Sequence, residues 1–416
     1  MAVKKRIKAV NPQEKIMKKT LIFFVSLAVI LSGGCSSKDN IILHEKWPFP
    51  AGTAVPGART NNGNLNSRIA DALNSGSPQH RLLKHFNVVA AENEMKPYAL
   101  MPEDIPLSGS WSAGYNWTDS DRLVNYAQAN GKRVRGHVLI WHDQTPAWFF
   151  KGSGVSGRAA VDELYFRMEN HIKTVFEKYG GKIEWWDVCN EVVDHTSGGP
   201  RQDSNYTRIM QDAGKRGMDR YEYVIKAFEW ARKYADLNGG QNVKLYLTDY
   251  GIERRFPGES RSKIDDFEDL VKYLVDNNAP IDGIGFQGHF RLYDHTPQEI
   301  GLGIDRFSEI NGKKLMIQVC ELDISVYSNA KNEANELNLS DDILKERLKD
   351  LASFYREYFD MFAEKYREGK LDMVILWGIA DGHSWLNNHP VAGRTDYPLL
   401  FDRKHQPKEA YWALVN

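Results

Sequence analysis

Two apolar stretches of this chain each deliver a glutamate at their carboxyl end. The β-prone run 185–189 ends abruptly in Asn190 and Glu191, and the run 314–320 ends in Glu321. A carboxylate at the end of a buried strand costs free energy unless it has a partner or a function. We therefore expect Glu191 and Glu321 to face each other as an acid/base or nucleophilic pair.

Such a pair can cleave a glycosidic bond. One carboxylic acid, still protonated near neutral pH, protonates the leaving oxygen, while a second, ionised carboxylate acts at the anomeric carbon. A separation of about 5–5.5 Å makes the reaction retaining. Two carboxylates this close also raise the pKa of one of them, because both cannot easily ionise together. The residues alone leave open whether Glu191 or Glu321 is the acid.

Alternating strand-like and helix-like segments predict how these side chains are held. Eight of each indicate an α/β fold, a (β/α)₈ TIM barrel with a single catalytic domain. A doubly wound open sheet is the alternative, but no Gly-x-Gly-x-x-Gly follows an early strand, so no dinucleotide site is expected. The strands are predicted near 51–55, 87–91, 133–140, 185–188, 244–248, 281–287, 314–321 and 373–377. The helices are predicted at 68–86, 121–130, 160–179, 221–237, 264–277, 297–310, 342–368 and 407–414.

In such a barrel the chemistry lies at the carboxyl ends of the strands. Any single polar residue there has a structural explanation, such as a helix cap or a hydrogen-bonded core histidine. Convergence of seven of the eight predicted strand ends on carboxylates, amides, imidazoles and indoles favours a site. Besides the residues already named, these ends carry Glu92, Asn93, Lys96, His137, Trp141, Asp249, Tyr250, Gln287, His289, Asp323, Trp377, Asp381 and Trp385.

From about Trp47 to its end, the chain resembles family 10 glycoside hydrolases, which are retaining endo-β-1,4-xylanases. A set of motifs in a fixed order carries the resemblance. They are Glu92-Asn-Glu-Met-Lys96, Gly136-His-Val-Leu-Ile-Trp-His142, Trp186-Asp-Val-Cys-Asn-Glu191, Asp249-Tyr250, Gln287-Gly-His289, Glu321-Leu-Asp323, Trp377-Gly-Ile-Ala-Asp381, Ser384-Trp385, Pro398-Leu-Leu-Phe-Asp402 and Pro407-Lys-Glu-Ala-Tyr411.

The resemblance implies a role for each matching residue. Glu191 resembles the general acid/base and Glu321 the nucleophile, and Asn190 would bind the 2-hydroxyl of the sugar being cleaved. His289 would keep Glu321 ionised and would itself be held by Asp323. The expected substrate-binding residues are Glu92, Asn93 and Lys96 for the sugar one unit further out, and His137, Trp141, Gln287, Trp377 and Trp385 around the proximal sugar.

Three positions depart from the family pattern. Cys189 stands where Val is more frequent, and Cys320 stands where Thr is more frequent. Thr248 stands where Asn is more usual, so the contact that an Asn would make at that loop is not expected here. Three cysteines in all argue against a disulfide framework, and we expect Cys189 and Cys320 to be reduced and buried.

Composition and motifs weigh against other functions. A formal net charge of −1 provides no electrostatic reason to expect nucleic acid as a partner. No cofactor or metal is expected: a metal-dependent barrel hydrolase would carry His-x-His on its first strand, where residues 52–55 have no histidine. A retaining β-1,4-glucanase or mixed-linkage glucanase, and a surface lipoprotein that binds glycan without cutting it, are the remaining alternatives to a xylanase acting on xylan and xylo-oligosaccharides.

The amino-terminal segment has the features of an export signal. We expect residues 1–34 to be a signal peptide whose true start is Met17, because a charged start precedes the apolar run 21–31, which is too short to span a membrane. The following Ser32-Gly-Gly-Cys35 resembles a lipobox, so Cys35 is expected to carry lipid and to anchor the protein to a membrane. Residues 35–46 would be a polar tether and 47–416 the catalytic domain, in a bacterial outer-membrane lipoprotein that is surface-exposed or periplasmic, or otherwise secreted.

Overall fold

The computed structural model describes residues 41–56, 68–108, 110–152, 154–194, 198–255, 261–328 and 335–416. The predicted signal peptide, Cys35 and residues 35–40 of the predicted tether lie outside the described residues. Residues 42–416 form one compact unit. Leu43–Glu45 make a short 3₁₀ turn in which Leu43 is fully buried. The folded unit therefore begins at Ile42 rather than at Trp47, and the predicted tether is shorter at this end.

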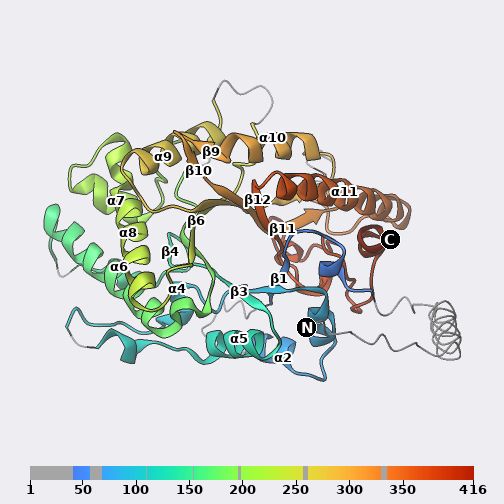
Figure 1. Cartoon of the computed structure of the whole chain (residues 1–416), viewed down its shortest axis with the longest axis horizontal. Coiled ribbons are helices and arrows are strands. Elements are labelled where there is room, and N and C mark those ends of the chain that lie inside the picture. Colours follow the sequence, from blue (N-terminus) through green and yellow to red (C-terminus); the bar gives the residue numbers. More distant parts are fainter. Residues whose placement is uncertain are drawn as a thin grey trace, which may run out of the picture. The chain divides into compact units, whose positions relative to one another are not determined.

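Eight parallel strands of the described unit close into a barrel, which Figure 1 shows at its centre. Their order is β1–β2–β3–β5–β6–β7–β11–β12, and the pairing of β12 with both β11 and β1 completes the ring. The predicted (β/α)₈ barrel is confirmed. The barrel strands are β1 (Ala51–Val55), β2 (Val88–Ala91), β3 (Arg133–Gly136), β5 (Trp185–Asn190), β6 (Lys244–Asp249), β7 (Gly283–Phe286), β11 (Met316–Ser325) and β12 (Leu371–Leu376).

Two further strands continue the ladder beyond the barrel rim. β4 (Ile140–Trp141) pairs with β5, and β8 (His289–Arg291) pairs with β11. The predicted strand 133–140 is therefore interrupted after Gly136, where the His137 side chain turns toward β5. β7 and β8 are separated at Gly288, whose φ of +77° is a conformation that glycine adopts without strain. A short antiparallel hairpin of β9 (Glu309–Ile310) and β10 (Lys313–Lys314) completes the strands.

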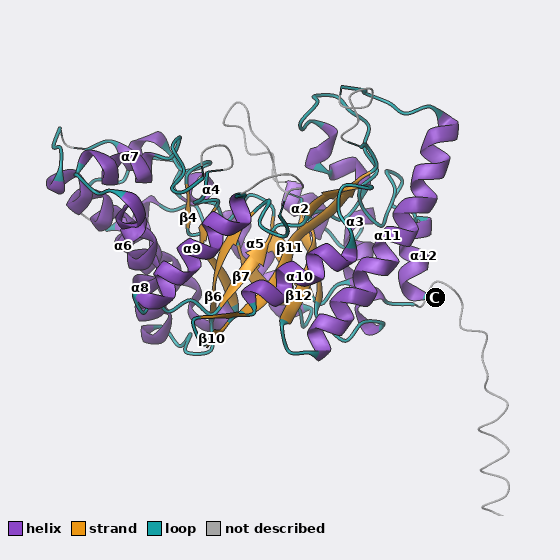
Figure 2. Ribbon diagram, turned by 90° about the horizontal axis from the view of Figure 1, so that it is seen from above, coloured by secondary structure: helices purple, strands orange, loops and turns teal. Residues whose placement is uncertain are grey.

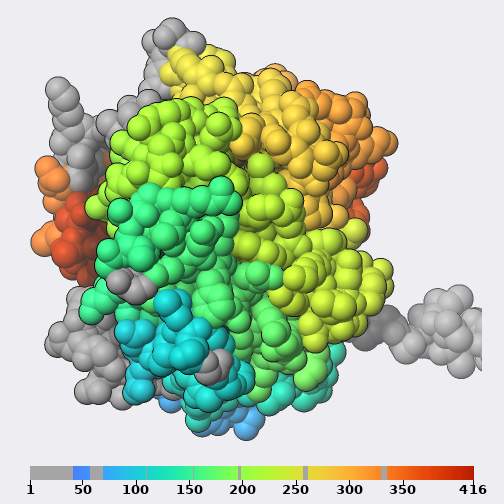
Figure 3. Space-filling view, turned by 90° about the vertical axis from the view of Figure 1, so that its left-hand side faces the viewer, coloured from blue at the N-terminus to red at the C-terminus, as the bar shows by residue number. Residues whose placement is uncertain are grey.

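Helices surround the barrel on the outside, as Figure 2 shows from above. Figure 3 shows the molecular surface on one side, formed largely by the green to yellow part of the chain. The predicted helix 68–86 is wrong in one respect: it is broken into α2 and α3. Ser77 caps α3, with its Oγ accepting from the His80 N–H at 3.0 Å, and Pro78 occupies the first turn, where its missing N–H costs nothing. α4 and α7 were not predicted. The helices are α2 (Arg68–Leu73), α3 (Pro78–Leu82), α4 (Pro97–Leu100), α5 (Thr118–Ala129), α6 (Arg158–Tyr179), α7 (Asn205–Asp212), α8 (Glu222–Leu237), α9 (Lys263–Asp276), α10 (Pro297–Phe307), α11 (Asp341–Arg367) and α12 (Glu409–Val415).

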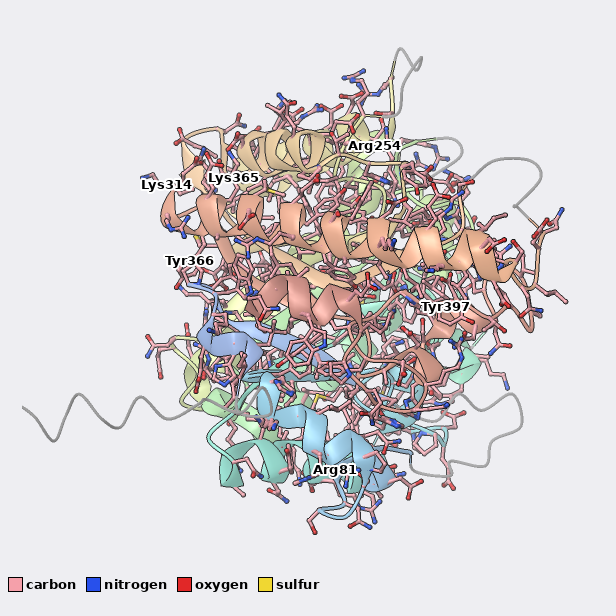
Figure 4. The ribbon with its side chains drawn as sticks, turned by 90° about the vertical axis from the view of Figure 1, so that its right-hand side faces the viewer. Arg81, Arg254, Lys314, Lys365, Tyr366 and Tyr397 are labelled. Carbon is pink, nitrogen blue, oxygen red and sulfur yellow. The ribbon has the colours of Figure 1, made fainter. Side chains whose placement is uncertain are left out.

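The carboxyl ends of the barrel strands can be located in Figure 4. In Figure 4, α11 crosses the outside of the barrel, with Lys365 near Lys314 at one end of the view and Tyr397 at the other. Lys314 precedes β11 and Tyr397 follows β12, so the carboxyl ends of the strands open on the Tyr397 side.

None of the helices within the described residues is long and apolar enough to cross a membrane.

Side chains at alternate strand positions fill the barrel interior in layers. The lowest layer is a buried apolar cluster. It consists of Val88, Trp185, Tyr246, Met373 and Ile375. Two positions beyond Trp185 on β5, the interior becomes charged with Asp187, which pairs with Arg135 of β3. His137, two residues after Arg135 and just beyond the end of β3, contacts the same carboxylate and continues the polar interior.

Candidate active site

A fully buried ion pair lies beneath the mouth of the barrel. Nη2 of Arg135 contacts Oδ1 of Asp187, and neither side chain is exposed. Arg135 Nε donates to Gln318 Oε1 at 2.9 Å, and Thr248 Oγ1 donates to Asp187 Oδ1. Thr248 lies on β6 (Lys244–Asp249), within the predicted strand, and its hydroxyl points into the barrel interior. A buried charge pair needs such additional hydrogen bonds to offset its loss of hydration.

His137 connects this ion pair to Glu321. Its Nδ1 lies 2.8 Å from Asp187 Oδ2 and 3.8 Å from Glu321 Oε1. The hydrogen bond to Asp187 holds the imidazole ring in one orientation. Trp377 packs against the same ring, edge to face, with ring centres 5.4 Å apart. The interior polar layer thus sets the position of two residues predicted to wall the proximal sugar.

Glu321 is a buried carboxylate, 5% exposed. Its Oε2 lies next to His289, whereas its Oε1 makes no hydrogen bond to any described residue. His289 Nε2 lies 3.3 Å from Oε2. His289 Nδ1 lies 2.9 Å from Asp323 Oδ1, and Trp385 Nε1 donates to Asp323 Oδ2 at 2.8 Å. Oε1 lies 3.8 Å from His137 Nδ1. The predicted carboxylate–imidazole–carboxylate chain is present in the structure.

Charge keeps Glu321 ionised although it is buried. Burial by itself raises the pKa of a carboxyl group, but His137, the His289 hydrogen bond and charge, and Lys96 lower the pKa of Glu321 to about 2. Burial acts on His289 in the opposite sense, yet Asp323 and Glu321 raise the pKa of His289 to about 10. At neutral pH the pair is therefore an imidazolium beside a carboxylate, which is the form that a nucleophile requires.

Glu191 is held by neutral donors on two sides. Trp141 Nε1 donates to its Oε2 at 3.0 Å, and Gln287 Nε2 donates to its Oε1 at 2.9 Å. Its backbone N–H donates to Thr248 O at 2.9 Å, and its φ is +54°, in the left-handed region that costs a non-glycine residue about 1–2 kcal/mol. That conformation turns the side chain from the end of β5 toward the mouth.

Gln287 links the two glutamates. Its side chain donates to Glu191 and, at 3.3 Å, to Asn190 Oδ1. Its backbone carbonyl accepts from the Glu321 N–H at 2.8 Å. The residues predicted as acid/base, nucleophile and 2-hydroxyl ligand therefore meet around one glutamine, with different donors at each carboxylate.

The segment after β2 joins the same mouth from the other side. Lys96 Nζ donates to Asn93 Oδ1 at 3.1 Å and lies 4.8 Å from the centre of the Trp141 ring. Glu92 directly precedes Asn93 and is half-buried. The structure thus brings Lys96, one of the predicted distal-sugar residues, next to Trp141, which itself donates a hydrogen bond to Glu191. Their roles in substrate binding stay predictions.

With this geometry in place, the family can be assigned. The family model for glycosyl hydrolase family 10 matches residues 56–416. The chain belongs to glycosyl hydrolase family 10.

Named relatives of the family align with most of this chain. Endo-1,4-beta-xylanase C of Paenibacillus barcinonensis is 40% identical over 349 residues, which cover 83% of this chain but 30% of that longer protein. Beta-1,4-xylanase of Dictyoglomus thermophilum is 36% identical over 343 residues, covering 82% of this chain and 85% of that protein. A solved family 10 structure from Paenibacillus barcinonensis superposes with a TM-score of 0.76 at 36% identity, covering 91% of this chain and 97% of the other.

The departures from the family 10 pattern lie in the buried layer. Cys189 and Cys320 are free and buried, as predicted. A Cβ atom at Gly285 would lie 3.1 Å from Cys320 Sγ and 2.4 Å from Thr248 Oγ1, so these two side chains occupy the space that glycine leaves. Cys320 Sγ donates to Phe286 O at 3.2 Å. The substitutions therefore change the packing beneath the family 10 site rather than its mouth.

Besides Arg201, whose Nη1 lies 3.9 Å from Glu191 Oε2, two residues at the site were missed by sequence reasoning. Gln144 accepts from Lys96 Nζ at 2.8 Å and has a φ of +44°. Glu253 is buried, and its Oε1 accepts from the Gly288 N–H at 3.0 Å, between Gln287 and His289. Both follow a strand end by a few positions, in polar segments that the strand-end rule could have included.

Replacing His289 with alanine is expected to move the acid limb of the kcat/KM profile to higher pH by about one unit. The reason is that the imidazolium favours the ionised form of Glu321, so its loss raises the pKa of that carboxyl from about 2 toward its usual range. The measurement is the pH dependence of kcat/KM between pH 2 and 7, restricted to conditions where circular dichroism shows the variant folded. His80→Ala, on α3, is the control. An unchanged acid limb would show that His289 does not favour the ionised form of Glu321.

Proposed function

We propose that this chain is a retaining endo-1,4-β-xylanase that hydrolyses internal β-1,4 linkages of xylan by double displacement. The observation that supports this proposal most is that the two glutamates around Gln287 have different neighbours. Glu321 lies beside an imidazolium, whereas Glu191 accepts hydrogen bonds from an indole and an amide. Family 10 membership and the xylanase names of its relatives support the same activity.

In the first step, Glu321 Oε1 attacks the anomeric carbon while Glu191 protonates the leaving glycosidic oxygen. The C–O bond to the leaving sugar breaks and an ester bond to Glu321 forms. Asn190 binds the 2-hydroxyl of the reacting xylose, a contact that strengthens in the transition state. In the second step, Glu191 takes a proton from water, which displaces Glu321 and restores the configuration of the substrate.

The remaining mouth residues bind the chain of sugars on either side of the reacting one. Trp141, Trp377 and Trp385 offer flat faces to the sugar rings. His137, Gln287, Asn93, Lys96 and Glu92 offer partners to their hydroxyl groups.

Reducing-sugar release from soluble xylan and from carboxymethylcellulose tests this function. A xylanase releases sugar from xylan and much less from the cellulose derivative. Release mainly from carboxymethylcellulose would favour the glucanase alternative. Release from neither substrate would favour a surface protein that binds glycan without cutting it.

We also propose that the protein is exported and lipid-anchored through Cys35, in the bacterial outer membrane. The support is the charged start at Met17, the apolar run 21–31 and the lipobox-like Ser32-Gly-Gly-Cys35. Acyl chains on a single cysteine together make a stable anchor.

Replacing Cys35 with serine is expected to move the xylanase from the membrane fraction to the soluble fraction, because serine cannot carry the thioether-linked lipid. The measurement is activity in each fraction, with Ser36→Ala as the matched control. Protease treatment of intact cells then separates a surface location from a periplasmic one. Equal membrane activity in wild-type protein and Cys35→Ser would rule out the anchor.

A further inference from the structure

Besides Trp141 and Gln287, Glu191 faces one cation. Nη1 of Arg201 lies 3.9 Å from Glu191 Oε2, and the Arg201 side chain is 11% exposed. This distance is too long for a hydrogen bond but close enough for a strong charge–charge interaction in a partly buried setting. Oε2 takes its hydrogen bond from Trp141. Arg201 therefore supplies charge to the carboxyl group without occupying its lone pairs.

Arg201 is held in place by partners of its own. Its backbone N–H donates to Val192 O at 3.0 Å, next to Glu191 in the chain. Its Nε lies 2.8 Å from Asp203 Oδ1, and its Nη1 donates to the Tyr250 hydroxyl at 3.4 Å. Asp203 itself is 65% exposed. The guanidinium charge is therefore partly balanced by a carboxylate that water screens.

Tyr250 is fixed from below. Lys263 Nζ lies 3.4 Å from the centre of the Tyr250 ring and 2.6 Å from Asp249 Oδ1. Asp249 Oδ2 accepts from the Val193 N–H at 3.2 Å, two residues after Glu191. The segment that carries Glu191 and the segment that orients Arg201 are thus attached to the same buried carboxylate.

A direct guanidinium–carboxylate pair would hold Glu191 permanently ionised, which would prevent it from acting as an acid. The Arg201 charge lies 3.9 Å away and is shared with Asp203, so its field at Glu191 is weaker than that of a direct pair. Such an arrangement suits a residue that must donate a proton in one step and accept one in the next. The charged and titratable groups around Glu191 and Arg201 are His142, Asp143, Asp203, Asp249, Tyr250, Lys263 and, across Gln287, Glu321.

We propose that Arg201 is a positioning residue that sets the balance between the acid and base forms of Glu191, with Asp203 attenuating its charge. The inference rests on the proposed xylanase function, in which Glu191 carries a proton in both steps. On this proposal, removing the Arg201 charge and removing the Asp203 charge shift the pH profile in opposite directions. A purely structural role of this segment would not predict opposite shifts.

The test is the basic limb of the kcat/KM profile on xylohexaose, which reports the essential acid of the free enzyme. Arg201→Met is expected to move this limb to higher pH by about one unit, and Asp203→Asn to lower pH by about half a unit. Arg201→Lys keeps the charge and is expected to stay within about 0.3 units of wild type. Arg208→Met is the matched control, since Arg208 contacts the Asp203 backbone oxygen and not Glu191.

His142 also titrates near Arg201, since burial and Arg201 lower its pKa. The shifts are therefore measured again in a His142→Gln background, where they are expected to persist. Shifts of the same sign in Arg201→Met and Asp203→Asn, or an unmoved basic limb in both, would overturn the inference. Arg201→Lys and Asp203→Asn still decide the matter should Arg201→Met fold poorly. Wild-type protein that does not cut xylohexaose would instead contradict the proposed function itself.

Discussion

Replacing Glu321 with alanine is expected to lower the turnover of xylan by about 10⁵-fold, the scale on which removal of a nucleophile acts. The reason is that Oε1, the carboxylate oxygen that makes no hydrogen bond within the described part of the chain, is the atom that we propose forms the bond to the anomeric carbon. Added azide can enter the space left by the carboxylate and attack the same face. Azide is therefore expected to restore turnover of an aryl β-xylobioside and to yield the inverted α-glycosyl azide, identified by proton NMR.

Glu299→Ala, on the outer helix α10, is the control for this experiment and is expected to keep wild-type activity. Azide is also expected to leave the wild-type rate unchanged. Rescue that yields the β-glycosyl azide, or no rescue of a folded variant, would remove Glu321 from the role of nucleophile.

Replacing Glu191 with alanine is expected to have an effect that depends on the leaving group. Xylan has a poor leaving group that needs a proton, so its kcat/KM should fall by about 10²–10⁴-fold. A dinitrophenyl β-xylobioside needs almost no protonation, so its kcat/KM should fall by less than about tenfold. Measurement of both substrates with one enzyme preparation separates loss of acid catalysis from loss of folding.

The two glutamate variants are controls for one another. In Glu191→Ala the nucleophile Glu321 is intact, so azide should intercept the covalent intermediate and yield the β-glycosyl azide. The opposite configuration is expected from Glu321→Ala. Equal losses of Glu191→Ala on xylan and on the activated substrate would contradict its role as the acid.

Much of this architecture could be predicted because its signals are local. Alternating apolar periodicity locates the barrel strands to within a few residues, and the strand-end rule then collects Glu191, Glu321, His289 and Asp323 without any knowledge of their contacts. The break between α2 and α3 was also signalled locally, by the Ser77-Pro78 pair, and was overlooked because the apolar pattern continues across it.

Other features depend on contacts that no local pattern encodes. The end of β7 follows from the φ of +77° at Gly288, and the direction of Glu191 follows from its own positive φ. Thr248 was expected in the strand 244–248, but the hydrogen bond from its hydroxyl to Asp187 could not be predicted from that position. Arg201 reaches Glu191 from the connection between β5 and α7, so its charge at the site could not be inferred from sequence spacing.

The central claim is that Glu191 and Glu321 flank one glycosidic bond closely enough for double displacement. The configuration of the first sugar released tests it most directly. Proton NMR recorded within minutes of adding enzyme to xylohexaose, before mutarotation, should show the β anomer at the new reducing end. Initial release of the α anomer would mean a single displacement by water and would contradict the account.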